Sequence, residues 1–496
     1  MMDLRQELRT LIGDWGPGHV MKTAYDTAWV ARLNDIDPCL SEPALNWLCE
    51  NQLPDGSWGA ASPQYDHDRL ISTLAAVIAL ARHNKGGRMS RQIEAGLAAL
   101  ERIAGGSCEG RLGDPDIATV GFELIVPTLV SEAESLGILQ RQGNGILNRL
   151  NHLRQAKLNR LNGFKINRNL SIAYSLEMAG PDHQHLLDLD NLQEENGSVA
   201  LCPSATAYYA AHVRPGDEKA LNYLRSVMRE DGGIPMVAPF NIYERAWVLW
   251  NLSLTGMLDD ELTALCQPHL DDLEQSWIAG RGVGFGTGGS APDGDDTGLV
   301  FSVLTAFGRP VDIEAVYHYE DPDGFRCYSL ETNRSISANA HILDAFKQLG
   351  KDRDHPQVQK ILRLLKNKQL SSGYWIDKWF TSPYYATAHV IISCCGYDPG
   401  MVEPAVQWII NTQNPDGSWG FDQPTAEETA YALQALSIWK RSGGAVSAKV
   451  IRDGAAWLAG HTEPPYPCLW IAKVLYYSEW VVRSEILSAL ILASQE

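Results

Sequence analysis

Two stretches of the chain, LNWLCENQLPDGSWGA at residues 45–60 and VQWIINTQNPDGSWGF at residues 406–421, align without a gap and share the segment PDGSWG. A third copy, LLKNKQLSSGYW, keeps the spacing QxxxGxW from Gln369 to Trp375. In each copy apolar residues recur at helical spacing before the glutamine, and a turn sequence follows. A second helical pattern comes after the turn, as in TAEETAYALQALSIW. Strand-like alternation is scarce, so we expect a repeated helix-turn-helix unit and an all-α protein.

The repeats also predict how these units pack. Helical hairpins that recur along a chain bury their apolar faces on one another. The glutamine and tryptophan at fixed spacing are expected to tie the turn of one hairpin to the next helix. The copies fall into two groups, one before about residue 240 and one after about residue 270. This grouping predicts two helical barrels rather than one long solenoid.

The composition limits the class of protein. The chain has 496 residues, of which 20% are charged and 45% are apolar, as in ordinary globular proteins. Its net charge of −19 argues against nucleic-acid binding, because phosphate contacts need clustered lysine and arginine. The nine cysteines include no CxxC pair and no metal-like spacing, which is typical of reduced thiols. We find no secretory leader and no apolar run that approaches a membrane span, so we expect a cytoplasmic protein without stable membrane insertion.

A cluster of acids occurs at residues 290–298, SAPDGDDTG, where Asp293, Asp295 and Asp296 precede the apolar stretch LVFSVLTAF. Taken alone, such a cluster is a helix N-cap, a metal site, or a carboxylic acid that is kept protonated for donation. Three carboxyl groups at close range cannot all ionise at low cost. At least one of them is therefore expected to stay protonated near pH 7.

Both features resemble those of known enzymes. The QxxxGxW repeats look like the QW motifs of the terpene cyclases that start by protonation, and the acid cluster looks like their Asp-x-Asp-Asp (DxDD) motif. The chain is most similar to the class II diterpene cyclases that retain the diphosphate, and among them to the compact bacterial halimadienyl and kolavenyl diphosphate synthases. This resemblance runs over essentially the whole chain. It is carried further by TAYDTAWVARL (23–33), ATVGFELIVPTL (118–129), YERAWVLWNL (243–252) and GRGVGF (280–285).

The resemblance implies two α/α barrels, called β and γ, with the γ barrel inserted after the first helix of the β barrel. On this basis residues 1–42 and 241–496 belong to the β barrel, which carries the acid motif, and residues 43–240 form the γ barrel. It also implies an isomerase, an intramolecular lyase, that cyclises geranylgeranyl diphosphate. Ionisation of the diphosphate is not expected, because DDELT at 259–263 and DDLEQ at 271–275 lack the last aspartate of a DDxxD motif.

In this family the middle aspartate protonates the terminal alkene, which implies Asp295 as the donor and Asp293 and Asp296 as groups that orient it. The stretch SISANAHILDAF offers His341 as the hydrogen-bond partner of the donor, with Asn339 close by; a purely structural histidine is the alternative. Aromatic faces stabilise a carbocation without attacking it. The aromatic candidates for lining the cavity, each with core packing as its alternative, are Trp375, Trp379, Tyr384, Tyr385 and Phe285.

The diphosphate of such a substrate needs cations. Lys378 in YWIDKWF matches a diphosphate-binding position of the family, and Arg281 and Lys165 are further candidates for which a solvated surface role is the alternative. The family uses Mg²⁺ with the diphosphate. Glu123 in VGFEL matches its acidic position, and Asp116 is a second possible ligand.

Tyr174 and Met236 stand where plant copalyl diphosphate synthases carry the histidine and asparagine that help to remove the final proton. Without that base the bicyclic cation can undergo successive hydride and methyl shifts, which predicts a rearranged product of halimadane or clerodane type. We expect kolavenyl diphosphate, the clerodane, because a phenol at position 174 stabilises the early cation without drawing off its proton. A separate class I synthase or transferase would then act on this product.

Other interpretations stay open at this point. Halimadienyl and copalyl diphosphate are alternative products, and farnesyl diphosphate as substrate would make the protein a drimenyl diphosphate synthase. A squalene-hopene-type cyclase shares the acid motif and the repeats, but it is normally longer and needs an apolar membrane-docking patch. A non-catalytic α/α-barrel binding protein is the alternative from a different functional class.

Overall fold

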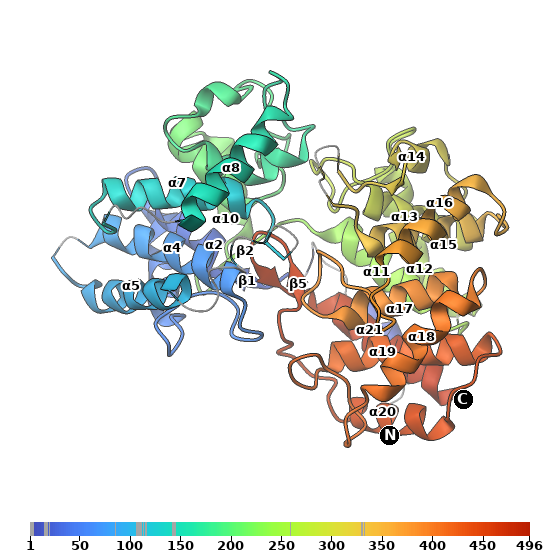
Figure 1. Ribbon diagram of the computed structural model, residues 1–496. Helices are drawn as coiled ribbons and strands as arrows, with labels where there is room; N and C mark the ends of the chain where they lie inside the picture. The colour runs from blue at the N-terminus through green and yellow to red at the C-terminus, as the bar shows by residue number, and fades with distance from the viewer. Residues whose placement is uncertain are drawn as a thin grey trace.

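The computed structural model describes residues 4–13, 18, 20–84, 86–105, 112, 114, 117–140, 145–257, 259–328, 331 and 333–496. Two bundles of helices lie beside each other, as Figure 1 shows, one from the first half of the chain and one from the second. The strands in the described part of the chain form three short two-stranded ribbons. The prediction of an all-α protein is therefore confirmed. None of the described helices combines the length and the apolar composition that crossing a bilayer requires.

Six helices of the C-terminal bundle form a closed inner ring, because each packs on the next and the last packs back on the first. The inner helices are buried on all sides, as in α17, where every residue is buried. They are α11 (Asn241–Leu254), α13 (Gly294–Ala306), α15 (Ile336–Gln348), α17 (Pro383–Cys394), α19 (Ala426–Arg441) and α21 (Glu479–Ser494). Outside this ring lie α12 (Asp260–Ser276), α14 (Glu314–Tyr317), α16 (Pro356–Lys368), α18 (Pro399–Asn411) and α20 (Ala448–Leu458).

The N-terminal bundle closes in the same way, and the two rings together form the two α/α barrels that the resemblance implies. Its inner ring contains α2 (Ala24–Ala31), α4 (Asp66–His83), α7 (Phe122–Ser135), the 3₁₀ segment η1 (Ser171–Ala179) and α9 (Pro203–Tyr208). Its outer and short elements are α3 (Pro38–Glu50), α5 (Ser90–Gly105), α8 (Gly145–Asn159), η2 (Gln184–Leu186), η3 (Tyr209–Val213) and α10 (Glu218–Val227).

The chain crosses between the barrels near its start. Helix α1 (Leu4–Gly13) packs on α12 and α21 of the C-terminal barrel, whereas α2 and α3 pack on each other and on α4. All eight residues of α2 are buried inside the N-terminal barrel. The crossing therefore lies between α1 and α2, earlier than the expected boundary at residue 42. Both chain ends consequently lie at the C-terminal barrel (Figure 1).

Two of the ribbons join the barrels. Strands β1 (Lys22–Thr23) and β2 (Ile234–Pro235) pair antiparallel where the chain enters and leaves the N-terminal barrel. The hairpin of β5 (Trp470–Ile471) and β6 (Leu475–Tyr476) reaches across, and the carbonyl of Ala472 accepts a hydrogen bond from Val120 N–H (2.8 Å). The third ribbon, β3 (Glu320–Asp321) with β4 (Gly324–Phe325), stays within the C-terminal barrel.

The repeated glutamine and tryptophan tie each turn to the helices beside it, as the sequence predicts. The Gln413 amide donates to the carbonyl of Gly417 in its own turn (3.0 Å) and to that of Val450 in the next outer helix, α20 (2.9 Å). The Trp419 indole donates back to Ile409 in the preceding helix (2.7 Å). The same contacts recur for Gln52 with Trp58 and for Gln369 with Trp375.

Candidate active site

A cavity of about 470 Å³ lies between the two barrels and is lined by residues of both. The C-terminal barrel contributes Asp295 at the start of α13 and the β5–β6 hairpin with Trp470. The N-terminal barrel contributes Glu123 at the start of α7 and Lys157 in the last turn of α8. The wall that the C-terminal barrel forms is therefore acidic and aromatic, and the part of the wall that α8 forms is basic.

Asp293 and Asp296 are buried carboxyl groups whose surroundings disfavour ionisation. Asp293 is the N-cap of α13, where its Oδ1 accepts hydrogen bonds from the N–H groups of Asp295 (3.0 Å) and Asp296 (2.9 Å). Burial raises the pKa of Asp293 to about 7 in spite of these bonds. Burial, and next the charge of Asp293, raises the pKa of Asp296 well above its usual range. Asp293 thus serves both as the N-cap of α13 and as a member of the acid cluster.

All three aspartates line the cavity, but Asp295 differs from its two neighbours because its side chain is the least buried of the three. The Asp295 side chain is 22% exposed, whereas Asp293 and Asp296 are buried residues. Its Oδ1 lies 2.5 Å from Nδ1 of His341 on α15. On the far side of this ring, Nε2 of His341 lies 3.0 Å from Nδ1 of His389 on α17. The cluster, the predicted partner and a second histidine therefore form one continuous chain of polar contacts.

A glycine allows this contact between α13 and α15. Gly298 lies on α13 one turn after Asp295, and a Cβ atom there would come within 2.7 Å of a side-chain carbon of Ile342. Because position 298 has no side chain, α13 can approach α15 closely enough for Asp295 to reach His341.

Asn339 lies two residues before His341 but points elsewhere, which corrects its expected place beside the acid. Its amide donates to the carbonyls of Phe325 (2.9 Å) and Ser335 (2.8 Å), and its oxygen accepts from Phe325 N–H (2.9 Å). Residues two apart on a helix project roughly 200° from each other. Asn339 therefore holds strand β4 against α15 and does not contact the acid.

Aromatic side chains cover much of the cavity wall. Of the predicted residues, Trp379, Tyr385, Phe285, Tyr174 and Met236 line the cavity. Other aromatic lining residues were not predicted from the sequence, although the aromatic density of LWIAKVLYYSEW at 469–480 was a usable signal. The missed lining residues are Tyr243, Phe240, Tyr328, Trp470 and Tyr476.

Trp375 and Tyr384 do not line the cavity, so the predictions for them are corrected. Trp375 belongs to a repeat turn, where its indole donates to the carbonyl of Leu365 (2.8 Å). Tyr384 is next to Tyr385 on α17, and adjacent helical residues point about 100° apart. Its ring packs against Trp408 of the outer helix α18 at 4.8 Å instead of facing the cavity.

Lys378 lies at the cavity wall with its Nζ 4.8 Å from the centre of the Trp379 ring. The ammonium group forms an ion pair with Glu331 and donates to the carbonyl of Asn333 (2.7 Å). Lys378 is therefore a cation at the lining, already neutralised by one carboxylate.

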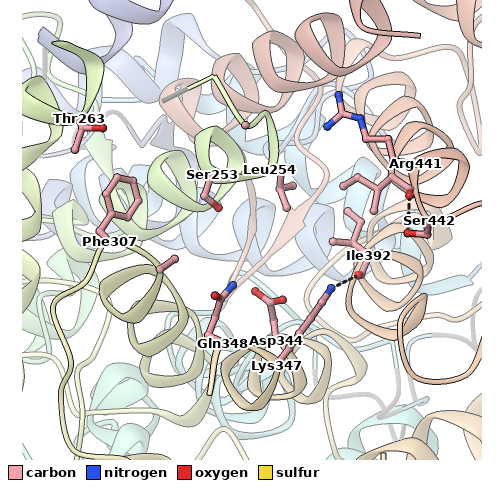
Figure 2. A pocket seen from close by; sticks show the side chains of 13 residues that line it. Ser253, Leu254, Thr263, Phe307, Asp344, Lys347, Gln348, Ile392, Arg441 and Ser442 are labelled. Carbon is pink, nitrogen blue, oxygen red and sulfur yellow. Dashed lines mark hydrogen bonds between the residues drawn. The ribbon is translucent and has the colours of Figure 1, made fainter. Parts of the chain in front are cut away.

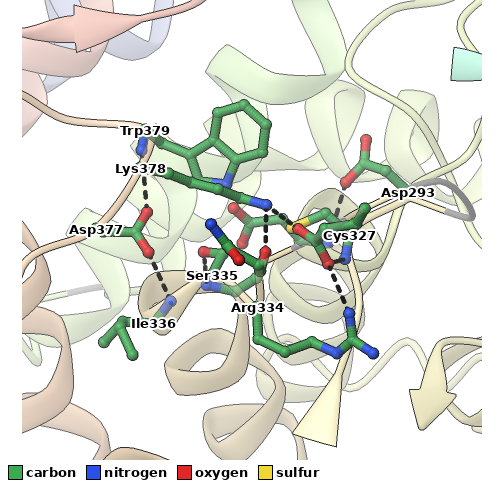
Figure 3. Close-up of polar contacts among 12 residues, drawn as sticks. Asp293, Cys327, Arg334, Ser335, Ile336, Asp377, Lys378 and Trp379 are labelled. Atoms are coloured by element: carbon green, nitrogen blue, oxygen red, sulfur yellow. Dashed lines mark hydrogen bonds and ion pairs between the residues drawn. The ribbon is translucent and has the colours of Figure 1, made fainter. Parts of the chain in front are cut away.

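The residue before it, Asp377, anchors this loop, as Figure 3 shows. Its carboxylate accepts from the N–H of Trp379 (3.2 Å) within the loop and from the N–H of Ile336 (2.5 Å) at the start of α15. Asp377 thus satisfies an N–H at the first turn of the helix that carries His341. These hydrogen bonds fix the position of the loop that carries Lys378 relative to His341.

Three basic residues of the N-terminal barrel that were not predicted from the sequence also line the cavity, namely Lys157, Arg160 and Arg168. Lys157 lies in the last turn of α8, and Arg160 directly follows the end of that helix. Lys157 forms an ion pair with Glu123, the expected Mg²⁺ ligand (2.7 Å).

The other predicted cations lie elsewhere. Arg281 and Lys165 are exposed and do not belong to the lining, which corrects their expected role at the diphosphate. Lys165 falls in the loop after α8, further along the chain than Arg160. Asp116 lies outside the described residues.

Tyr174 and Met236 meet at the cavity wall, with the phenol oxygen 3.8 Å from Sδ. Burial raises the pKa of Tyr174 well above its usual value, so the phenol stays neutral. Behind it, the ammonium group of Lys473 lies 4.6 Å from the ring centre and donates to the Tyr174 carbonyl (2.7 Å). Of the described residues that line the cavity, none is a histidine.

A second cavity, of about 730 Å³, lies at the other end of the C-terminal barrel (Figure 2). It is lined by the ends of inner helices, including Leu254, Ala306, Lys347 and Arg441, and shares no described residue with the first cavity. Because the acid cluster lies at the opposite end of α13, this second cavity does not belong to the candidate active site.

Known proteins are similar to this chain over nearly its whole length. A family model described as "Squalene-hopene cyclase C-terminal domain" matches residues 330–464. The type B diterpene cyclase of Mycobacterium tuberculosis is 49% identical over 99% of both chains. The (+)-kolavenyl diphosphate synthase of Herpetosiphon aurantiacus is 31% identical over 98% of this chain and 97% of that one. The solved structure of ent-copalyl diphosphate synthase from Streptomyces platensis aligns with a TM-score of 0.81 at 29% identity, covering 99% of both chains.

Proposed function

Because the chain belongs to the class II diterpene cyclases, we propose that it protonates the terminal alkene of geranylgeranyl diphosphate and forms a rearranged bicyclic diphosphate. The observation that carries this proposal is the Asp295 carboxyl, which faces an aromatic cavity and contacts His341 at 2.5 Å. Members of this class are isomerases, since the proton added at the first step is matched by one lost at the last.

Asp295 supplies the first proton. Its O–H bond breaks while the π electrons of the terminal alkene form a C–H bond, and two further double bonds then close two rings. The crowding of Asp293, Asp295 and Asp296 keeps a proton within the cluster. An N–H from His341 stabilises the carboxylate that Asp295 becomes after the proton transfer.

The aromatic wall serves the carbocation that follows. Ring faces attract a cation electrostatically at up to about 6 Å and offer no lone pair that would quench it. Trp379, Tyr385 and Trp470 lie on the same wall as the acid and suit the early positive charge. Water is kept out of the reaction space by this apolar lining.

The diphosphate is proposed to bind at the basic part of the lining, where Lys157, Arg160 and Arg168 come from the N-terminal barrel. Lys378 is a further cation at the wall. A Mg²⁺ ion in such a site usually takes one or two protein carboxylates and the oxygens of the phosphates, and Glu123 fits that donor set because its carboxylate lines the cavity beside Lys157. Bound there, the ion would neutralise and orient the diphosphate, which is retained.

A rearranged product is favoured by the surroundings of Tyr174. A neutral phenol beside a thioether is a poor base, so the bicyclic cation persists long enough for hydride and methyl shifts. We therefore propose a halimadane- or clerodane-type diphosphate. The Herpetosiphon relative is named a (+)-kolavenyl diphosphate synthase, which supports this proposal.

The test is product analysis with the purified enzyme. Geranylgeranyl diphosphate and Mg²⁺ should yield, after dephosphorylation, one rearranged bicyclic alcohol by mass spectrometry and NMR. Asp295→Asn, which keeps the size of the side chain but removes the acid, should lower turnover at least a hundredfold. Copalol as the product would contradict the rearrangement, and turnover of farnesyl diphosphate or squalene in preference would contradict the substrate. An active Asp295→Asn enzyme would overturn the protonation mechanism.

A further inference from the structure

We infer that His389 is a positioning residue that sets the direction of the hydrogen bond between His341 and Asp295. The inference rests on the proposed function and adds to it a residue outside the cavity lining. His389 is fully buried on α17, and its Nδ1 lies 3.0 Å from Nε2 of His341. Through that contact it determines whether Nδ1 of His341 presents an N–H or a lone pair to Asp295.

The two rings allow only two proton arrangements when both are neutral. Each neutral imidazole carries one N–H, and a hydrogen bond between them needs a donor on one side and an acceptor on the other. In the first arrangement His389 donates to Nε2 of His341, and His341 donates from Nδ1 to Asp295. In the second arrangement both bonds point the other way. Mixed arrangements would place two protons or two lone pairs face to face at 3.0 Å.

The surroundings of His389 select the first arrangement. Burial, and next the proximity of His341, lowers the pKa of His389 well below its usual value, so the ring stays neutral. Its Nε2 is buried and meets no hydrogen-bond partner among the described residues. In the second arrangement this atom would carry an unpaired buried N–H, and such orphaned donors are rarer than orphaned acceptors. His389 therefore keeps its proton on Nδ1 and donates it to His341.

The direction matters for the chemistry of Asp295. An imidazole that presents its lone pair to a carboxylic acid is the stronger base of the two and takes the proton. In the second arrangement His341 would thus draw the proton away from Asp295 before the alkene could receive it. In the first arrangement His341 offers an N–H, which leaves the proton on Asp295 and stabilises the carboxylate after transfer.

The ring of His389 is held in place by aromatic neighbours. It stacks on Trp250 with centroids 4.7 Å apart and planes at 18°. The Trp250 indole is itself anchored by a hydrogen bond to Asp344 (3.2 Å). Trp247 lies edge-on to both histidines, with its centroid 5.1 Å from each. The ring cannot turn Nδ1 away from His341 without breaking this packing.

Two variants of equal shape test the inference. Asparagine and leucine have nearly the same outline, but only the asparagine amide can donate an N–H to Nε2 of His341. We expect His389→Leu to lower kcat about 10- to 100-fold, by analogy with the loss that follows removal of the hydrogen-bond partner of a metal-ligating histidine. KM should change little, because His389 does not line the cavity. His389→Asn should recover most of the lost kcat.

The folding of the His389 variants and the tautomer of His341 are measured separately. Thermal unfolding of both variants identifies any general loss of structure, and ¹⁵N NMR of histidine-labelled protein reports whether Nδ1 or Nε2 of His341 carries the proton. Equal activity of His389→Leu and the wild type, or equal loss in the Leu and Asn variants, would overturn the inference. Asp295→Asn, measured in parallel, separates the outcomes, since an active Asp295→Asn enzyme would overturn the proposed function itself.

Discussion

At the scale of single residues, Tyr174 is where the proposed reaction path is decided. The bicyclic cation loses a proton early if a base is close and rearranges if none is. The Tyr174 phenol is neutral because burial raises its pKa, and it lies 3.8 Å from the Met236 sulfur. Neither group is an effective base, which supports the proposal that the cation rearranges before it loses a proton.

A histidine at position 174 would supply the missing base. We expect Tyr174→His to shift the product from the rearranged skeleton towards copalyl diphosphate, with copalol becoming a major alcohol after dephosphorylation. Gas chromatography with mass spectrometry gives the product ratio directly.

Tyr174→Phe is the matched control for this change, because it keeps the ring and removes only the hydroxyl. It should leave the rearranged product dominant. If the phenylalanine and histidine variants gave the same product mixture, the volume of the side chain rather than its basicity would control the outcome.

Single residues also show where sequence reasoning succeeded and where it failed. The contact of Asp295 with His341 was predicted, because both positions sit in recognisable motifs. Asn339 and Trp375 were placed wrongly, because a motif does not state which face of a helix a side chain occupies. His389 was missed, since a histidine within the apolar run of α17 has no distinguishing pattern around it.

At the scale of elements, the distance between α13 and α15 determines whether Asp295 can contact His341. Both helices are inner helices of one barrel, and the glycine at position 298 sets their approach. Their packing explains why an acid in the first turn of one helix can meet a histidine in the middle of the next.

Adding one methyl group at this position should therefore reduce activity. In Gly298→Ala the new Cβ would lie 2.7 Å from a side-chain carbon of Ile342 and 3.3 Å from its backbone nitrogen, so α13 must move away from α15. We expect at least a tenfold loss of kcat, because the Asp295–His341 contact lengthens, together with about 1–3 kcal/mol of destabilisation.

Gly396→Ala provides the control, since a Cβ there meets nothing within 4 Å. Activity assays and thermal unfolding of the two variants should differ clearly. Full activity in Gly298→Ala would show that the acid tolerates a wider helix spacing than the structure indicates.

The repeat contacts were predictable for a related reason. The Gln413 amide bonds to a turn four residues on and to the next hairpin, so the whole unit is encoded locally. The choice between Tyr384 and Tyr385 was not predictable, because α17 is buried on all sides and hydrophobic periodicity cannot identify its cavity face.

At the scale of the whole molecule, the cavity exists only because the two barrels are held together. Lys157 and Asp295 line the same space but lie far apart in the chain, and no local pattern relates them. The sequence predicted two barrels, yet it could not predict which residues of one face the other. That is why Arg281 and Lys165 were chosen in place of Lys157, Arg160 and Arg168.

The β5–β6 hairpin carries a buried ion pair across this junction. Its tip inserts Lys473 into the N-terminal barrel, where the ammonium group lies 2.6 Å from Glu177 and both side chains have no exposed surface. Burial works to lower the pKa of Lys473, but Cys202, Glu177 and Asp26 raise it above its usual value, so the ammonium group stays charged. The pair therefore fixes the position of the hairpin, and with it one wall of the cavity.

Breaking this pair should cost more stability than removing it entirely. Lys473→Met leaves the Glu177 carboxylate buried without its partner, for which we expect a loss of about 3–5 kcal/mol. The double variant Lys473→Met, Glu177→Gln removes both charges and should recover most of that loss.

Lys449→Met is the control, because Lys449 pairs with Asp453 on the surface with 75% of its side chain exposed, and such a pair contributes at most about 1 kcal/mol. Urea unfolding followed by tryptophan fluorescence would measure all three variants, and a double variant no more stable than Lys473→Met would show that the hairpin depends on shape rather than on charge.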